Sequence, residues 1–338
     1  MNQLIKPKAL KRGDTIALIS VSGGRAGDDD MLPRYQVGKA RLKEQFGLDA
    51  IECPNSLRGS DYLYKNPEAR AEDLMWALKN PDVKGMIANM GGDDSYRVLP
   101  FIDLAVIHDN PKVFMGYSDI ASWTTCFAAA GVMSYYGPNV LTPIAQPGRL
   151  DDYTCYYINK TLFDTNIIGK IEPSKQYTPI EWGNKSEEEI HWTQNSGFKV
   201  IQGKGKVSGR LFGGCGAPIR QIMGTSIFPT REFFEDCILF LEIGSPYNSL
   251  LAGLHELRAL DAAGLFRKAK GLLTGPLTEE EEKVLLKFMK YEARREDMPI
   301  LTNIDFAHRT PMCIIPLGAM AEIDCENRTF WILESGVC

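Results

Sequence analysis

Ser118 is the first residue whose type and position could do chemistry. It stands in a Gly-Tyr-Ser-Asp sequence between an apolar segment that predicts a strand at 112–115 and a pattern that predicts a helix at 120–130. Such a strand–turn–helix presents a serine hydroxyl at the carboxyl edge of a sheet, beside a helix N-terminus. There it could attack a carbonyl, and the amide of Asp119 could bind the oxyanion that forms. A plain helix cap is the alternative, because Ile120 stands where the Gly-x-Ser-x-Gly motif has glycine.

A serine nucleophile needs a base, and the chain has four histidines. His308 follows an apolar segment at 300–306 that predicts a strand. Polar residues just past strand ends are where open sheets place their sites. We expect His108 at the surface, His191 in an acidic segment and His255 inside an amphipathic helix. His308 is therefore the candidate base, and a surface histidine with a structural role is the alternative at this point.

An orienting carboxylate and a second oxyanion donor are also present. Glu242 ends an apolar segment that begins at Cys237, so it lies at the rim of a core and could accept a hydrogen bond from the imidazole of His308. Gly91 and Gly92 follow another predicted strand, and their amides can take conformations that other residues avoid. The alternatives are a strand that simply enters solvent at Glu242 and a plain turn at the two glycines.

The predicted secondary structure that must position these residues differs between the first and second halves of the chain. Apolar segments alternate with helical patterns over 1–165, which predicts an α/β domain with an open, mostly parallel, Rossmann-like sheet. Residues 166–200 are polar and predict a linker, and 201–338 predict a β-rich domain with a few helices. The candidate nucleophile lies in the first domain and both of its partners lie in the second, so neither domain should be active alone.

Composition limits the class of protein. The chain has 338 residues, which favours two domains at about 100–200 residues each. Its 38 Lys and Arg against 43 Asp and Glu give a net charge of −5, which argues against a binder of polymeric nucleic acid. No signal-peptide pattern is present, and no apolar run approaches the ~18 residues that span a membrane. We expect no nucleic-acid or membrane partner and a cytoplasmic location.

No pattern in the sequence indicates a metal or a cofactor. The eight cysteines include no Cys-x-x-Cys pair, which predicts free thiols in a reducing compartment rather than disulfides or a zinc site. Asp93 and Asp94 have no histidine or further carboxylate close in sequence. Gly-x-Gly-x-x-Gly and Gly-Lys-Ser are both missing, which argues against a dehydrogenase and against the common nucleotide-binding loops. We expect neither a metal nor a cofactor.

The order of several motifs resembles the LD-carboxypeptidase and microcin immunity protein family, nearer to its immunity-like branch. The resemblance extends over about 15–325. The motifs that carry it are Gly-Gly-Asp-Asp-Ser (91–95), Gly-Tyr-Ser-Asp-Ile (116–120), Tyr-Gly-Pro (136–138), Gly-Gly (213–214), Leu-Glu (241–242), Asp-Phe-Ala-His (305–308) and Pro-Leu-Gly-Ala (316–319).

This resemblance implies a serine hydrolase without a cofactor, whose site lies in a cleft between an α/β domain and a β-rich domain. It implies Ser118 as the nucleophile, Glu242 as the orienting carboxylate and His308 as the base. The oxyanion would be held by the backbone amides of Gly92 and Asp119. We also expect a homodimer.

Two substrate classes remain open. The amide of an aminoacyl or peptidyl nucleotide, cleaved in antibiotic self-immunity or detoxification, is favoured, and the bond before the terminal D-alanine of a muropeptide is the alternative. Trp182 and Trp192 lie in a long loop that resembles the immunity-like branch. An indole over the cleft would stack a nucleobase, which is worth ~1–3 kcal/mol in nucleic-acid systems. Packing of the linker is the other role open to these tryptophans, and a non-catalytic nucleotide-binding protein is the alternative of another class.

Two residues depart from the family pattern. Immunity-like relatives often have Gly-Gly-Asn where this chain has Cys215, and a thiol is a weaker hydrogen-bond donor than an amide. This departure argues against phosphoramidate-linked nucleotides, although Cys215 and Gly91 are still expected to contact substrate. Ala307 stands where the family commonly has glycine, and its methyl group is expected to tighten the turn before His308.

Overall fold

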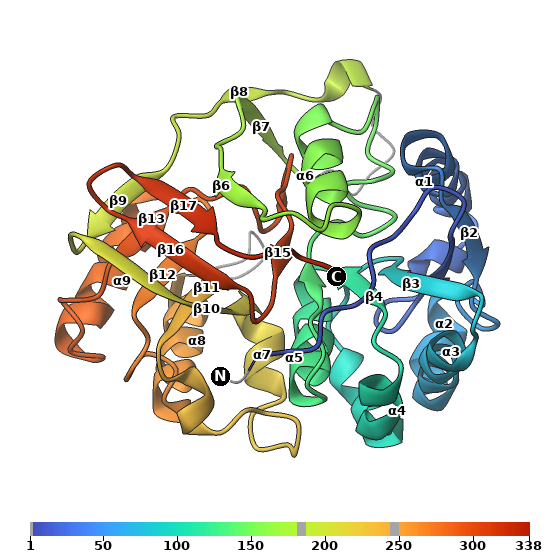
Figure 1. The fold of residues 1–338 in the computed structure, drawn as a ribbon, viewed down its shortest axis with the longest axis horizontal. Helices are drawn as coiled ribbons and strands as arrows, with labels where there is room; N and C mark the ends of the chain where they lie inside the picture. The colour runs from blue at the N-terminus through green and yellow to red at the C-terminus, as the bar shows by residue number, and fades with distance from the viewer. Residues whose placement is uncertain (1–2, 181–186, 244–249) are drawn as a thin grey trace.

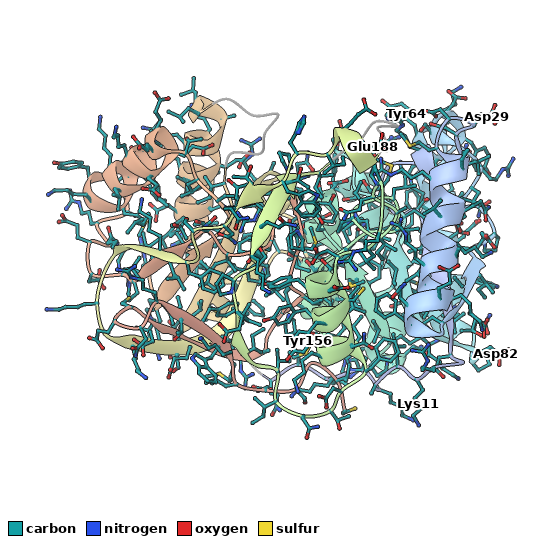
Figure 2. All side chains as sticks on the ribbon, turned by 90° about the horizontal axis from the view of Figure 1, so that it is seen from above. Lys11, Asp29, Tyr64, Asp82, Tyr156 and Glu188 are labelled. Carbon is teal, nitrogen blue, oxygen red and sulfur yellow. The ribbon has the colours of Figure 1, made fainter. Side chains whose placement is uncertain are left out.

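The computed structural model describes residues 3–180, 187–243 and 250–338. Figure 1 shows two sheets beside each other, with the N-terminal half in blue to green and the C-terminal half in yellow to red. Figure 2 shows the same two halves from above, with Asp29 and Asp82 at the outer margin of the N-terminal half. The predicted α/β class, with a mostly parallel N-terminal sheet and a strand-rich C-terminal part, is confirmed.

The N-terminal half contains a mostly parallel sheet covered by helices. Its strands and helices are β1 (Thr15–Ile19), α1 (Leu32–Phe46), β2 (Asp49–Glu52), α2 (Ser60–Lys65), α3 (Pro67–Lys79), β3 (Val83–Ala88), α4 (Leu104–Asp109), β4 (Val113–Gly116), α5 (Ala121–Ala129), β5 (Tyr135–Tyr136) and α6 (Asp152–Leu162). Short 3-10 helices are η1 (Arg25–Gly27), η2 (Ser95–Phe101) and η3 (Ser118–Ile120). The six-stranded sheet has the order β15-β5-β4-β3-β1-β2. Its outermost strand, β15 (Ile315–Pro316), comes from near the end of the chain and pairs antiparallel with β5.

The strand that leads to Ser118 is held firmly in this half. All four residues of β4 are buried, as expected for a parallel strand covered on both faces. Phe114 of β4 stacks on Phe127 of α5 with ring centroids 4.5 Å apart. Burying each ring stabilises the fold by about 1.5–3 kcal/mol. The strand before Ser118 and the helix after it are therefore packed directly on each other.

The C-terminal half contains a larger, mixed sheet. Its elements are β6 (Gly169–Ile171), β7 (Gln176–Pro179), η4 (Glu187–Glu189), β8 (Thr193–Gln194), β9 (Lys199–Gln202), β10 (Lys206–Cys215), α7 (Gly216–Gln221), η5 (Arg231–Phe234), β11 (Cys237–Glu242), α8 (Leu250–Ala263), β12 (Gly271–Thr274), α9 (Glu279–Tyr291), β13 (Ile300–Thr302), β14 (Arg309–Thr310), β16 (Met320–Asp324) and β17 (Thr329–Ile332). The eight-stranded sheet has the order β6-β17-β16-β10-β11-β12-β13-β9. Strands β10 to β13 are parallel, with α8 and α9 in the connections between them.

Two segments differ from their sequence-based description. The polar segment 166–200 contains β6, which joins the eight-stranded sheet, and β7 and β8, which form a three-stranded sheet with β14 in the order β14-β7-β8. The domain boundaries themselves stay predictions. The strand predicted at 300–306 ends at Thr302, because Asn303 takes a left-handed conformation with φ 65° and turns the chain. Across the described ranges, we find no helix with the length and apolar character needed to cross a membrane.

Candidate active site

Ser118 lies on a sharp turn between β4 and α5. Its φ is 65°, a left-handed conformation that costs a residue with a side chain about 1–2 kcal/mol. Gly91 lies directly against it, since a Cβ at Gly91 would stand 2.8 Å from the Ser118 Cβ and 3.0 Å from its Oγ. The sequence folds this way because the buried strand ends at Gly116 and a helix must start within the next few residues. The turn raises the hydroxyl above the carboxyl edge of the sheet.

The structure brings the three predicted residues of the triad together. Ser118 comes from the turn after β4, Glu242 ends β11, and His308 lies in the loop between β13 and β14. The Nε2 atom of His308 lies 3.0 Å from Ser118 Oγ. Its Nδ1 atom makes a short hydrogen bond with Glu242 Oε1, and the same oxygen accepts the backbone N–H of His308 at 3.2 Å. A hydroxyl, an imidazole and a carboxylate thus form one continuous line of contacts.

The imidazole and the carboxylate are nearly inaccessible to solvent. Their side chains are 7% and 5% exposed. Burial alone lowers the pKa of His308, but the negative charge of Glu242 and its hydrogen bond together outweigh this and raise that pKa above 6.5. Because Glu242 accepts at Nδ1, the neutral imidazole carries its proton there. Nε2 is then the acceptor that faces the serine hydroxyl.

The raised pKa of His308 gives an expected pH dependence. Only the neutral imidazole can accept the Ser118 proton, so kcat/KM should fall as pH is lowered through the pKa of His308. We expect a single acid limb with a midpoint above the ordinary value of 6.5 and full activity on its alkaline side. A kcat/KM profile between pH 5 and pH 9 measures this. A midpoint below 6.5 would contradict the raised pKa.

Of the two predicted oxyanion donors, Asp119 directly follows the serine, and Gly92 follows Gly91, which contacts Ser118. A Cβ at Gly91 would be 3.3 Å from the Asp119 nitrogen, which places Gly91 close to this amide. Among the described residues, neither the Gly92 N–H nor the Asp119 N–H donates to a backbone carbonyl of a turn or loop. The Asp119 side chain points inward, where it accepts Ser22 Oγ–H at 2.5 Å and the Ser95 N–H at 2.9 Å. These bonds hold the Asp119 backbone in place.

Of the predicted substrate contacts, Cys215 lies in the described part of the chain and Trp182 does not. Cys215 is the last residue of β10 and lies opposite Glu242 in the parallel register with β11. Burial and the nearby charge of Glu242 raise the pKa of its thiol well above the ordinary value, so it stays protonated. Trp182 lies outside the described residues. Ile180, the last described residue before it, donates its backbone N–H to the carbonyl of His308 at 3.2 Å.

Trp192 borders a pocket next to the His308 loop. The indole is 37% exposed, and the pocket has a volume of about 170 Å³. Thr310, two residues after His308, and Thr178 form part of its wall and pair with each other between β14 and β7. Arg149 adds a positive charge to the wall. The pocket is therefore attached to the same loop that carries His308.

Two charged residues hold the His308 loop, a role that their positions in the sequence do not establish. Arg309 and Asp305 form an ion pair whose side chains are 3% and 0% exposed. Asp305 also accepts the Ser174 N–H at 2.7 Å and its hydroxyl at 2.8 Å. Between the pair, Ala307 has a φ of 81°, the conformation that makes glycine common at such a position. The sequence feature that could have indicated this role is the carboxylate of Asp305, three residues before the candidate base His308.

Replacing Asp305 by alanine should destabilise the protein by about 3–5 kcal/mol, because it leaves the buried Arg309 charge without its partner. Chemical denaturation followed by circular dichroism measures the change. Asp297 makes a comparable pair with Arg295 but is 71% exposed, so Asp297→Ala is the matched control, with an expected loss below about 1 kcal/mol. Equal effects of the two substitutions would show that burial of the Asp305–Arg309 pair is not what matters.

The groups at Ser118, His308 and Glu242 are the ones that nucleophilic catalysis by a serine uses. A hydroxyl, an imidazole in contact with it and with a carboxylate, and the backbone amide that follows the hydroxyl are groups used in acyl transfer. Among the residues that the structure describes, no group of three or more His, Cys, Asp or Glu side chains could hold a metal ion.

Comparison with known proteins agrees with this chemistry. Residues 16–137 match the model of the LD-carboxypeptidase N-terminal domain, and residues 208–323 match that of the C-terminal domain. A putative carboxypeptidase of Vibrio cholerae is 29% identical over 97% of each chain. The microcin C7 self-immunity protein MccF of Escherichia coli is 28% identical over 78% of each chain.

A solved structure is similar over most of the chain. The MccF-like protein of Streptococcus pneumoniae, in complex with AMP, is 27% identical, with a TM-score of 0.85 over 94% of this chain and 98% of that one. Together the two domain models cover most of the chain in the expected order. The chain therefore belongs to the LD-carboxypeptidase family, and it is an enzyme of the serine carboxypeptidase and amidase class.

Proposed function

We propose that Ser118, His308 and Glu242 act as a catalytic triad that hydrolyses an amide bond next to an amino-acid residue. The observation that carries this proposal is the line of contacts from Ser118 Oγ through both imidazole nitrogens to Glu242. The three residues come from separate parts of the chain, and a helix cap would not require that. Burial of the imidazole and the carboxylate further supports a role in catalysis, because an exposed pair would be solvated instead.

The reaction follows from the placement of the protons. His308 Nε2 accepts the Ser118 proton while Oγ bonds to the scissile carbonyl carbon. The resulting oxyanion accepts hydrogen bonds from the Gly92 and Asp119 amides. His308 then gives its proton to the departing nitrogen as the C–N bond breaks, which leaves an acyl-enzyme. Water, deprotonated by His308, releases the acid and restores Ser118. Glu242 holds the imidazole tautomer in every step.

For the substrate, we favour the amide of an aminoacyl or peptidyl nucleotide, as in antibiotic self-immunity. The similarity to the self-immunity protein of Escherichia coli and to a neighbour solved with AMP supports this class. The pocket next to the His308 loop supports it too, since Trp192 supplies a flat apolar surface. We propose Gly91, Trp182 and Cys215 as further substrate contacts. The protonated, buried thiol of Cys215 suits a contact with an uncharged group better than one with a phosphate.

A muropeptide is the second candidate. The matched family models are those of LD-carboxypeptidases, and the Vibrio cholerae relative carries the name of a putative carboxypeptidase. Such a substrate would present the amide before a terminal D-alanine. The same triad would act on it without change, so only the product distinguishes the two classes.

Mass spectrometry of the products separates the candidates. The enzyme is incubated with a muropeptide mixture and, separately, with aminoacyl sulfamoyl-adenosines, with Ser118→Ala as the blank. Release of sulfamoyl-adenosine supports the favoured class, and loss of terminal D-alanine supports the second. If both substrates stay intact while Ser118 still reacts with a fluorophosphonate, both substrate assignments are wrong. If Ser118 does not react either, a non-catalytic binding protein is the better description.

Two further predictions concern assembly and location. We propose a homodimer located in the cytoplasm. Light scattering coupled to size-exclusion chromatography gives the mass directly, against 37.7 kDa for one chain. A monomer at micromolar concentration would contradict the dimer.

A further inference from the structure

Tyr136 connects the backbone of Ser118 to the side chain of Glu242. Its hydroxyl accepts the Ser118 N–H at 3.2 Å and donates to Glu242 Oε2 at 3.1 Å. Burial and the charge of Glu242 raise the pKa of Tyr136 well above its ordinary value, so the phenol keeps its proton and remains a donor. One side chain therefore touches the nucleophilic residue and the orienting carboxylate at the same time.

The ring of Tyr136 is fixed by residues that lead to the other members of the proposed triad. It packs edge-on against Phe240, with centroids 5.7 Å apart, and against Phe306 at 6.3 Å. Phe240 is two residues before Glu242, and Phe306 is two residues before His308. A Cβ at Gly214 would stand 3.2 Å from the ring, so a larger residue there would displace it. Tyr136 itself is 1% exposed, which leaves no bulk water to replace its hydroxyl.

Both carboxylate oxygens of Glu242 therefore accept hydrogen bonds. Oε1 accepts the two N–H groups of His308, and Oε2 accepts the hydroxyl of Tyr136. With donors on both sides, the carboxylate cannot rotate about its last bond without losing one of them. The bond to Tyr136 also removes the Ser118 N–H from the set of possible oxyanion donors. The amide of the next residue, Asp119, is left to serve that purpose.

We propose that Tyr136 is a positioning residue, which holds the Glu242 carboxylate and the Ser118 turn in the geometry that their reaction with His308 requires. Tyr136 belongs to β5 in the N-terminal sheet, whereas Glu242 ends β11 in the C-terminal sheet. Its hydroxyl therefore ties the two halves of the site together across the boundary between the sheets. This inference rests on the proposed triad.

Removal of the Tyr136 hydroxyl is expected to raise the pKa of His308. Donation to Oε2 draws negative charge away from Oε1, the oxygen that faces His308. Without the hydroxyl, that charge concentrates beside the imidazole and raises the pKa of His308 further. Other ionisable groups also face Glu242, namely Cys215 from β10 and Glu256 from α8, and Arg220 of α7 faces Glu256. All of them stay unchanged in a Tyr136 variant.

The test is the pH dependence of labelling by a fluorophosphonate, because the rate of this reaction reports the Ser118–His308 pair without a known substrate. Tyr136→Phe should lower the second-order labelling rate on the alkaline plateau about 10-fold, and it should move the acid limb up by about one pH unit, as expected for a lost hydrogen bond to a charged group. The matched control is Tyr135→Phe. Tyr135 is also fully buried, but its hydroxyl donates to the carbonyl of Gly336 at 2.8 Å, away from Ser118.

The outcomes are distinguishable. A slower rate with a shifted acid limb in Tyr136→Phe alone supports the proposal. A slower rate with an unshifted limb in both variants means that each tyrosine matters only for stability, which thermal unfolding of the variants would also show, and this overturns the positioning role. A Tyr136→Phe profile like that of the wild type overturns it as well. If the wild type is not labelled on Ser118 at all, the proposed triad fails rather than the inference about Tyr136.

Discussion

Replacing Ser118 by alanine is expected to lower kcat/KM about 10³- to 10⁶-fold for whichever amide the enzyme hydrolyses. The substitution removes Oγ, the atom 3.0 Å from His308 Nε2, and leaves no nucleophile for the acyl-enzyme route. The oxyanion donors and the substrate contacts remain, so a residual rate above that of the uncatalysed reaction should persist. Steady-state kinetics with the substrate identified by product analysis measures the effect.

A second serine provides the control for this substitution. Ser134 is fully buried, whereas Ser118 is only partly buried, and the Ser134 hydroxyl donates to the carbonyl of Thr124 at 3.2 Å. Ser134→Ala should leave kcat/KM within about threefold of the wild type while losing roughly 1 kcal/mol of stability with that bond. If Ser118→Ala keeps more than about a tenth of the wild-type rate, the serine is not the nucleophile.

Replacing Glu242 by glutamine should lower kcat about 10²- to 10⁴-fold at neutral pH. A neutral amide next to Nδ1 no longer fixes the reactive tautomer and no longer stabilises the imidazolium that forms during attack. Because burial lowers the pKa of His308 while the charge and the hydrogen bond of Glu242 raise it, that pKa should fall in the variant. The acid limb of the pH profile should then move to lower pH.

The direction in which the acid limb moves distinguishes the role of Glu242 from that of Tyr136. Glu242→Gln should move the acid limb down, whereas Tyr136→Phe should move it up, although both variants are slower. Glu256→Gln is the matched control, since Glu256 is another buried carboxyl that faces Glu242 but is not part of the proposed triad. We expect it to change kcat by less than about threefold. An unchanged acid limb in Glu242→Gln would mean that Glu242 does not govern the protonation of His308.

The parts of the fold that follow from local patterns were predictable from the sequence. The apolar segment from Cys237 to Glu242 is a fully buried strand with the expected bounds. The strand before Ser118 and the helix after it also lie within a residue or two of their predicted positions. In both cases a run of apolar residues ends at a polar or glycine residue, and such a run has few other ways to be buried.

The parts that depend on distant contacts were not predictable. His308 lies in a loop that begins at Asn303, five residues before it, and the buried Asp305–Arg309 pair holds that loop. Nothing in the local pattern indicates which residues this pair contacts. The two-residue strand β15 joins the N-terminal sheet from the far end of the chain, and no periodicity can be read from two residues. The roles of the three triad residues accordingly came from family resemblance, and spacing alone left each of them open.

The contacts of Tyr136 within the site also depend on distant parts of the chain and were not predictable from the sequence. The sequence shows only a tyrosine before Gly-Pro, and its hydroxyl acquires two partners because β5 lies beside β4 while β11 ends nearby. Ser118 and Glu242 are far apart in the chain, so this bridge between them is a property of the assembled sheets.

Peptide mapping after reaction with a fluorophosphonate tests the central claim most directly. The wild-type enzyme should carry one adduct, on the peptide that contains Ser118, and the rate of its formation should fall as pH is lowered through the pKa of His308. Ser118→Ala should carry no adduct, and His308→Ala should react at least about 100-fold more slowly. An adduct on a different residue, or labelling of the wild type that does not depend on His308, would contradict the account.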